Sequence, residues 1–184
     1  MKKQIIILLA ILSMLVSSCS KDEIQLSKNY FGTVEVLKSG QKWKPLIYAS
    51  VNVQESQYIQ LEMAIYDKKN IARERLRFYI ISKKEGYNAV KSNEIIPDAD
   101  NENNIRFYSS YYTYAADGDV GCDIYSVADS TENAGNVTVT KYDDESGIIE
   151  GTFEVTLVKE SSCNPNAPDT LHFTEGVFST KIQD

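Results

Sequence analysis

Apolar and polar residues alternate along most of the chain beyond residue 30. The clearest stretch is 135–158, where Val137 and Val139 begin one alternating run and a second run follows an acidic turn at 143–147. A period of two places one set of side chains on a buried face and the other in water. Gly147 can adopt the positive φ that closes such a turn. This stretch is therefore predicted to be a β-hairpin around which the remaining sheet is arranged.

Glycine and proline indicate where the strands should deviate from regular geometry. Gly151 interrupts the buried row of the hairpin, which predicts a bulge or a close backbone approach. The pair Glu175-Gly176 predicts a kink in the last strand. Pro45 predicts an edge position or a bulge near the start of the second strand.

The same alternation predicts further strands before and after the hairpin. An Asp-Gly turn should join strands at 105–114 and 120–127, a short strand is expected at 86–90, and 91–104 should be the longest irregular loop. The predicted inward rows are Val34 and Val36; Trp43, Ile47, Ala49, Val51 and Val53; Ile59, Leu61, Met63 and Ile65; Leu76, Phe78 and Ile80; and Leu171, Phe173, Phe178 and Ile182. Arg73, Arg75 and Arg77 should face outward. The expected fold is all-β, an antiparallel β-sandwich or flattened barrel of about ten strands.

The first residues have the pattern of a secretory signal peptide. Lys2 and Lys3 precede an apolar run at 5–16, which is shorter than the roughly 20 residues that span a bilayer. Small residues then lead directly to Cys19, an arrangement that resembles a lipobox. We therefore expect a lipoprotein signal peptide at 1–18 and a lipidated flexible tether at 19–29. A single all-β domain should follow at 30–184.

The residues after Cys19 indicate where the lipoprotein is sent. Lys21, Asp22 and Glu23 resemble the short export signal that directs lipoproteins of Bacteroidota to the outer face of the outer membrane. Several acyl chains on one cysteine give stable anchoring, unlike a single chain. The expected location is the outer membrane, with the lipid-anchored domain exposed at the cell surface.

Charge and cysteine content narrow the classes of partner. The chain has 26 acidic and 19 basic residues and a net charge of −7, which disfavours nucleic acid as a partner. Cys122 and Cys163 could form a disulfide in an extracytoplasmic compartment. However, if the strand with Cys122 pairs with 137–142, the two cysteines lie at opposite ends, whereas a disulfide needs Cα atoms within about 7 Å. The pairing therefore stays open, and a disulfide would show that this strand order is wrong.

Four short stretches resemble motifs of one uncharacterised family. They are Gly40-Gln41-Lys42-Trp43, the run at 135–142, the run at 148–153, and Glu175-Gly176-Val177-Phe178. Together they are similar to an all-β lipoprotein domain common in Bacteroidota. The resemblance covers nearly all of the mature chain and implies the fold and the address, but no activity.

Catalytic and metal-binding motifs are weak. His172 is the single histidine and has no accompanying nucleophile motif, so we predict no enzymatic activity. Calcium ligands are conceivable at Asp117, Asp119 and Asp123, and in a second series at Asp98, Asp100 and Glu102. We interpret both groups as solvated turn carboxylates and expect no metal and no cofactor.

Tyrosine is the most suggestive residue type, with 12 in the chain. Tyr108, Tyr112, Tyr114 and Tyr125 are the candidate ligand contacts, since tyrosine offers rigid amphipathic contact area for sugars or proteins. Tyr108, Tyr112 and Tyr114 should share one strand face, while Tyr111 faces the other way and belongs in part to the core.

Two tripeptides bear on modification. Asp129-Ser130-Thr131 and Asp169-Thr170-Leu171 resemble an O-glycosylation signal of Bacteroides-type bacteria, which makes Ser130 and Thr170 candidate acceptors.

The sequence as a whole favours a monomeric surface-anchored lipoprotein that binds a glycan or a protein without transforming it. One alternative is a barrel that binds a small apolar ligand in a cavity lined by Trp43, Phe78 and Phe153. A second is a glycan-active hydrolase with two nearby carboxylates of perturbed pKa. A third is a structural subunit of an envelope complex, which would expose an apolar patch.

Overall fold

A computed structural model describes residues 32–51, 56–90, 94–98, 101–107, 109–128 and 134–183, and for Ile80, 94–98 and 101–107 it describes the backbone only. Several predicted features lie outside the described residues. They are the signal peptide and tether with Cys19, Lys21, Asp22 and Glu23, together with Val53, Asp100, Tyr108 and Ser130.

Strands account for all the regular structure in these ranges. They are β1 (Thr33–Lys38), β2 (Gln41–Trp43), β3 (Leu46–Val51), β4 (Tyr58–Tyr66), β5 (Ala72–Ser82), β6 (Gly86–Val90), β7 (Glu94–Asp98), β8 (Asn101–Phe107), β9 (Ser109–Tyr114), β10 (Gly121–Ser126), β11 (Gly135–Asp143), β12 (Ile148–Ser161) and β13 (Thr170–Gln183). Within the described part of the chain, no helix has the length and apolar character to cross a membrane.

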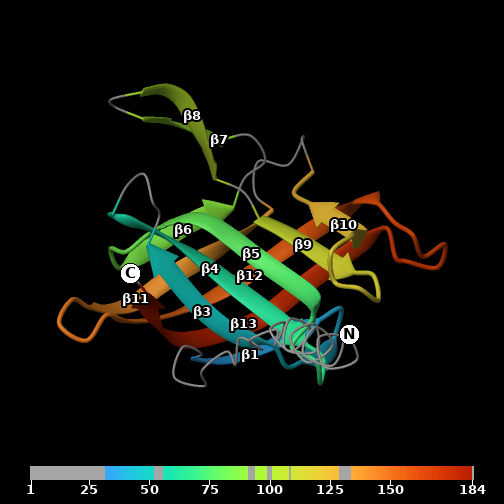
Figure 1. The fold of residues 1–184 in the computed structure, drawn as a ribbon. Helices are drawn as coiled ribbons and strands as arrows, with labels where there is room; N and C mark the ends of the chain where they lie inside the picture. The colour runs from blue at the N-terminus through green and yellow to red at the C-terminus, as the bar shows by residue number, and fades with distance from the viewer. Residues whose placement is uncertain are drawn as a thin grey trace, which may run out of the picture.

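The strands form two layers (Figure 1). The back layer has the order β6-β11-β12-β13-β1-β2, and the front layer has the order β3-β4-β5-β9-β10. The layers join at two corners, where the end of β13 pairs in parallel with β3 and the end of β12 pairs antiparallel with β10. The strands thus close into a ring, and the predicted all-β sandwich or flattened barrel is confirmed, with the β13–β3 pairing as a parallel exception.

The hairpin predicted from the alternating pattern is β11 and β12. Asp143 accepts hydrogen bonds from the backbone of Glu145 and Ser146, and Gly147 has a φ of 69°. The register shifts opposite Gly151, where an added Cβ would lie 2.8 Å from the Phe178 ring. The bulge and the close approach predicted at Gly151 are both present.

The predicted kink in β13 is a β-bulge. Glu175 has a φ of 55°, and the register shifts on both sides of β13 at this point. A Cβ on Gly176 would lie 2.6 Å from the ring of Phe153. The bulge therefore lets β13 follow the curve of the sandwich while Gly176 admits a core aromatic ring.

Two predictions about the strands were wrong. Within the range predicted to be an irregular loop, β7 and the first part of β8 instead pair as an antiparallel ribbon that projects from the sandwich (Figure 1). The second strand is interrupted at Pro45, since proline cannot donate a ladder hydrogen bond. Its two parts pair in different places, β2 with β1 and β3 with β4.

The core lies between the layers and is rich in aromatic rings. The ring centres of Phe78 in the front layer and Phe153 in the back layer are 5.2 Å apart, and those of Trp43 and Phe173 are 5.3 Å apart. Both pairs are in edge-to-face contact. The predicted inward residues that the structure describes are buried or half-buried. One adjustment occurs in β5, where a bulge brings Ile81 into the core opposite Ile59.

Candidate functional site

The inward-facing residues change from apolar to polar at one end of the sandwich. On β5, Leu76 and Phe78 are buried, and the next inward position is Glu74. Its neighbour across the sheet on β9 is Thr113, which follows the buried Tyr111 on the same face. A carboxylate and a hydroxyl therefore occupy positions that would be apolar in a continuous core.

Three donors converge on a single oxygen of Glu74. Lys38 Nζ, Trp43 Nε1 and the Tyr111 hydroxyl each donate a hydrogen bond to Oε2 at 2.7 Å. Lys38 Nζ also lies 2.8 Å from the Tyr111 hydroxyl oxygen and 4.9 Å from the centre of that ring. These contacts join β1, β2, β5 and β9, so the network links the front and back layers.

The network shifts the pKa values of Glu74 and Tyr111 in opposite directions. Burial raises the pKa of Glu74, but the hydrogen bonds from Lys38, Tyr111 and Trp43 outweigh burial and lower it overall. Burial and the nearby charge of Glu74 raise the pKa of the Tyr111 hydroxyl. At neutral pH the site therefore contains an ionised carboxylate and a protonated phenol.

Asp123 is the second carboxylate at this end. Its Oδ2 accepts a 2.8 Å hydrogen bond from Thr113 Oγ1, and Thr113 Oγ1 in turn accepts one from the Asp123 backbone N–H at 2.9 Å. Its Oδ1 accepts a 2.5 Å hydrogen bond from Ser162 Oγ, which in turn accepts one from the backbone N–H of Asn164 at 2.9 Å. Asp123 thus fixes the loop after β12 against β9 and β10.

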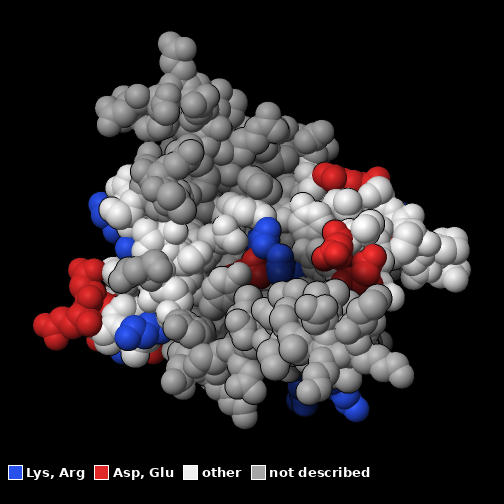
Figure 2. Space-filling model, viewed as in Figure 1, with Lys and Arg blue, Asp and Glu red and all other residues white. Residues whose placement is uncertain are grey.

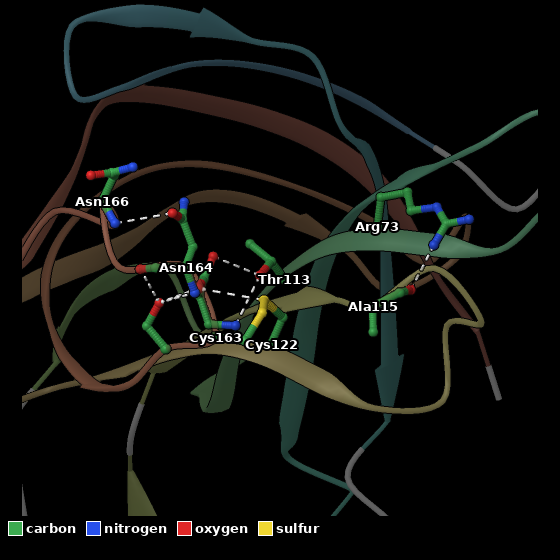
Figure 3. Close-up of a disulfide and its surroundings, with 9 residues drawn as sticks. Arg73, Thr113, Ala115, Cys122, Cys163, Asn164 and Asn166 are labelled. Atoms are coloured by element: carbon green, nitrogen blue, oxygen red, sulfur yellow. Dashed lines mark hydrogen bonds between the residues drawn. A yellow bond between two sulfur atoms is a disulfide. The ribbon is translucent and has the colours of Figure 1, made fainter.

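A disulfide holds the same loop. Cys122 on β10 and Cys163 are bonded, with Cα atoms 5.0 Å apart, and the backbone N–H of Cys163 donates to the carbonyl of Cys122 (Figure 3). The strand order that made this pairing awkward was wrong. Strand β12 is longer than β11, and its end pairs with β10, which brings both cysteines to one corner.

These elements surround an open pocket of about 280 Å³. Its lining residues are Lys38, Ser39, Gln41, Tyr111, Thr113, Asp123, Tyr125, Asn164, Ala167, Pro168 and Leu171. The volume lies just below the usual range for small-molecule sites, about 300–1,000 Å³. We refer to it as the mouth pocket, because it opens between the layers at one end of the sandwich.

The candidate tyrosines separate into two groups. Tyr125 is buried, donates a hydrogen bond to the carbonyl of Pro168 and lines the mouth pocket, so its role as a ligand contact stays a prediction. Tyr111 packs beside it with ring centres 5.9 Å apart. Tyr112 and Tyr114 lie on the outer face of β9, half-buried, with ring centres 6.5 Å apart. Period-two alternation explains the division.

Other candidate residues do not join the pocket. His172 is exposed on the outer face of β13 and contacts Thr156 Oγ1 through Nδ1 at 3.1 Å. Thr170 is half-buried at the start of β13, next to an exposed Asp169 that pairs with Lys159 at 2.7 Å. Among the described residues, one group has metal-ligand spacing, Cys122, Asp123 and Cys163, and its two sulfurs are already bonded to each other.

Sequence reasoning missed Lys38 and Glu74. Each continues the inward parity of an apolar row, since Lys38 follows Val34 and Val36, while Glu74 precedes Leu76 and Phe78. A charged residue in phase with a buried row is the signal that identifies such a site.

No protein-family model matches the chain, and comparisons with curated proteins and with solved structures gave no significant match.

Proposed function

We propose that this protein is a surface-anchored lipoprotein that acts as a non-catalytic binding module, and that its mouth pocket takes a sugar residue of a glycan. The observation that carries the proposal is a small concave site where inward-facing Lys38, Thr113 and Asp123 meet the amides of Gln41 and Asn164. This set of groups suits a ligand rich in hydroxyls.

The chemistry of the lining supports a sugar over an apolar ligand. Each sugar hydroxyl donates one hydrogen bond and accepts others, so it needs both kinds of partner. Asp123 supplies acceptors, Lys38 supplies donors, and the amides of Gln41 and Asn164 supply both. The apolar-ligand alternative requires an interior cavity lined jointly by Trp43, Phe78 and Phe153, but these rings are in contact with other rings. An open pocket of about 450 Å³ includes Trp43 in its lining but neither phenylalanine.

The state of Glu74 favours binding over glycoside cleavage. A general acid for that reaction needs a carboxyl whose pKa is raised. The pKa of Glu74 is lowered, and its Oε2 already accepts three hydrogen bonds. A carboxylate held in this way organises a site but is poorly suited to deliver a proton.

The location at the cell surface is part of the proposal. The lipobox-like residues before Cys19 and the acidic residues after it support export and lipidation. The Cys122–Cys163 disulfide is consistent with an oxidising compartment. Membership in an all-β lipoprotein family of Bacteroidota stays a prediction from the four motifs.

The anchor is tested by palmitate labelling of the full chain in its native membrane. We expect the label on the wild-type protein and none on Cys19→Ala, which should leave the membrane fraction. An unlabelled wild-type protein that stays soluble would contradict the anchor.

Sugar binding is tested with full-length protein in detergent on an array of neutral oligosaccharides, followed by saturation-transfer NMR with any sugar retained. Gln41→Ala should weaken binding, because it removes an amide from the pocket lining. Folding should be unaffected, because Gln41 is exposed. Lys38→Met should weaken binding further. The matched control is Gln183→Ala, at the end of β13 and outside the pocket lining.

We expect a roughly tenfold loss of affinity for Gln41→Ala, equivalent to about 1.4 kcal/mol, and a larger loss for Lys38→Met. Wild-type protein that retains no neutral sugar would overturn the proposed function. Binding that Gln41→Ala and Lys38→Met leave unchanged would place the site elsewhere.

A further inference from the structure

The outer face of the front layer carries a second cluster of charged and aromatic residues, separate from the mouth pocket. Glu62 on β4 lies opposite Arg77 on β5, and Arg75 is one outward position further along the same strand. Tyr112, on β9, lies opposite Arg75. Because cross-strand neighbours share a face, these residues form one surface across three strands.

One buried carboxylate organises two guanidinium groups. Glu62 is only 1% exposed, and its Oε1 lies 2.9 Å from Arg75 Nε while its Oε2 lies 2.5 Å from Arg77 Nε. Each arginine therefore contacts Glu62 through its inner nitrogen. Both arginines have a tyrosine partner as well, since Arg77 Nη1 contacts the Tyr79 hydroxyl and the Arg75 side chain forms a hydrogen bond with Tyr66.

The donors in this cluster outnumber the acceptors. Arginine has five N–H donors, and among the described residues Arg77 uses Nε for Glu62 and Nη1 for a long, 3.4 Å contact with the Tyr79 hydroxyl. The buried hydroxyl of Ser110, directly opposite Arg77 on β9, has no hydrogen-bond partner. The surplus of guanidinium donors could be satisfied by an acceptor from outside, whereas the Ser110 hydroxyl is buried and is not reached from the surface.

The local charge is opposite to that of the protein. Two arginines and one glutamate give the cluster a charge of +1, whereas the whole chain has −7. Figure 2 shows basic side chains near the middle of this view, with acidic side chains beside them, mainly to the right. Such a basic spot attracts an anionic group while the surrounding charge repels extended acidic surfaces.

Aromatic rings border the cluster on one side. The Arg75 guanidinium lies 5.4 Å from the centre of the Tyr114 ring, and Tyr112 is adjacent with a tilt of 35° between the two rings. Flat aromatic surface beside hydrogen-bonding groups suits the apolar face of a sugar ring. The planar guanidinium fork suits a carboxylate.

We infer that this outer face is a second ligand site, which binds an acidic sugar residue with its carboxylate on Arg75 and Arg77 and its ring against Tyr112 and Tyr114. The site does not depend on the mouth pocket. The two are separated by the thickness of the front sheet, since Thr113 faces the pocket while its neighbours Tyr112 and Tyr114 face outward.

The test measures binding of a trisaccharide of galacturonic acid to the full-length protein by calorimetry. Its comparison ligands are the same trisaccharide with the carboxyls reduced to alcohols and a short poly-glutamate peptide. We expect binding of the uronate, a loss of roughly tenfold or more with the reduced sugar, and weakening by salt.

Two variants probe the site in different ways. Arg75→Gln removes one guanidinium and should reduce affinity roughly tenfold. Tyr114→Ala removes the ring and keeps Glu62 and both arginines paired, so it should weaken binding even if Arg75→Gln folds poorly. Lys141→Gln is the matched control, because Lys141 is an exposed cation of the back layer.

Several outcomes would overturn the inference. They are equal binding of the reduced sugar, tighter binding of the peptide, uronate binding that Arg75→Gln and Tyr114→Ala leave unchanged, and no binding by the wild type. Gln41→Ala should not affect uronate binding. Failure of this site is therefore distinguishable from failure of the mouth pocket.

Discussion

Two carboxylates on neighbouring strands are both held by several partners, but they face opposite sides of the front layer and differ in partner type and in exposure. Glu62 on β4 faces outward and pairs with two arginines. Glu74 on β5 faces the space between the layers and accepts from one lysine, one indole and one phenol. Glu62 is 1% exposed, while the side chain of Glu74 is 26% exposed.

The difference shows how charge serves each region. Around Glu62, all three charged groups come from the front layer and leave a net charge of +1, which under our inference attracts an anionic ligand. Around Glu74, the donors come from both layers, so the network ties the sandwich together where its apolar core ends. Three predictions test this difference by the change in unfolding free energy or in ligand binding that each variant should cause.

The largest effect is expected from the disulfide, which supports the mouth pocket and not the outer face. The double variant Cys122→Ser with Cys163→Ser removes a link over a sequence separation of 41. By loop-closure entropy this should lower the free energy of unfolding by about 4 kcal/mol, measured by urea denaturation. Sugar binding at the pocket should weaken, and uronate binding at Arg75 should persist. An equal loss of affinity for the neutral sugar and for the uronate would contradict the distinction between the two regions.

A smaller effect is expected from Glu62→Ala. It leaves two guanidinium groups side by side with limited exposure, and breaking such a pair costs about 3 kcal/mol of unfolding free energy. The control is Glu150→Ala, whose exposed contact with Lys141 is 4.0 Å long and should be worth less than about 1 kcal/mol. Thermal denaturation at pH 7 provides the measurement. A loss no greater than that of the control would show that the cluster is not structural.

The smallest effect is expected from Glu74→Gln, about 1 kcal/mol at neutral pH, and it depends on pH. The folded pKa of Glu74 lies below its ordinary value of 4.5. Its contribution to stability is therefore complete above the unfolded pKa and is lost as the pH falls through the folded pKa. Urea denaturation at a series of acidic pH values should show the wild type and the variant converging. A difference that stays constant down to about pH 3 would contradict the role assigned to the charged form.

The sequence predicted local features well because they depend on neighbouring residues. The hairpin of β11 and β12 followed from alternation and from Gly147, and the irregularities at Gly151 and Glu175 followed from glycine. The outward direction of Arg75 and Arg77 followed from the parity of Leu76 and Phe78. The ribbon of β7 and β8 was missed because its polar composition resembles that of a loop.

Strand partners and site membership could not be predicted in this way. The sequence by itself determined which side chains share a face, because the period of two is a property of the extended backbone. Only the tertiary structure decided that β10 pairs with the end of β12, so that Cys122 meets Cys163, and that Lys38 reaches Glu74 from another layer. These pairings join segments far apart in the chain, and their energies come from packing and hydrogen bonding across the sandwich, which no local pattern encodes.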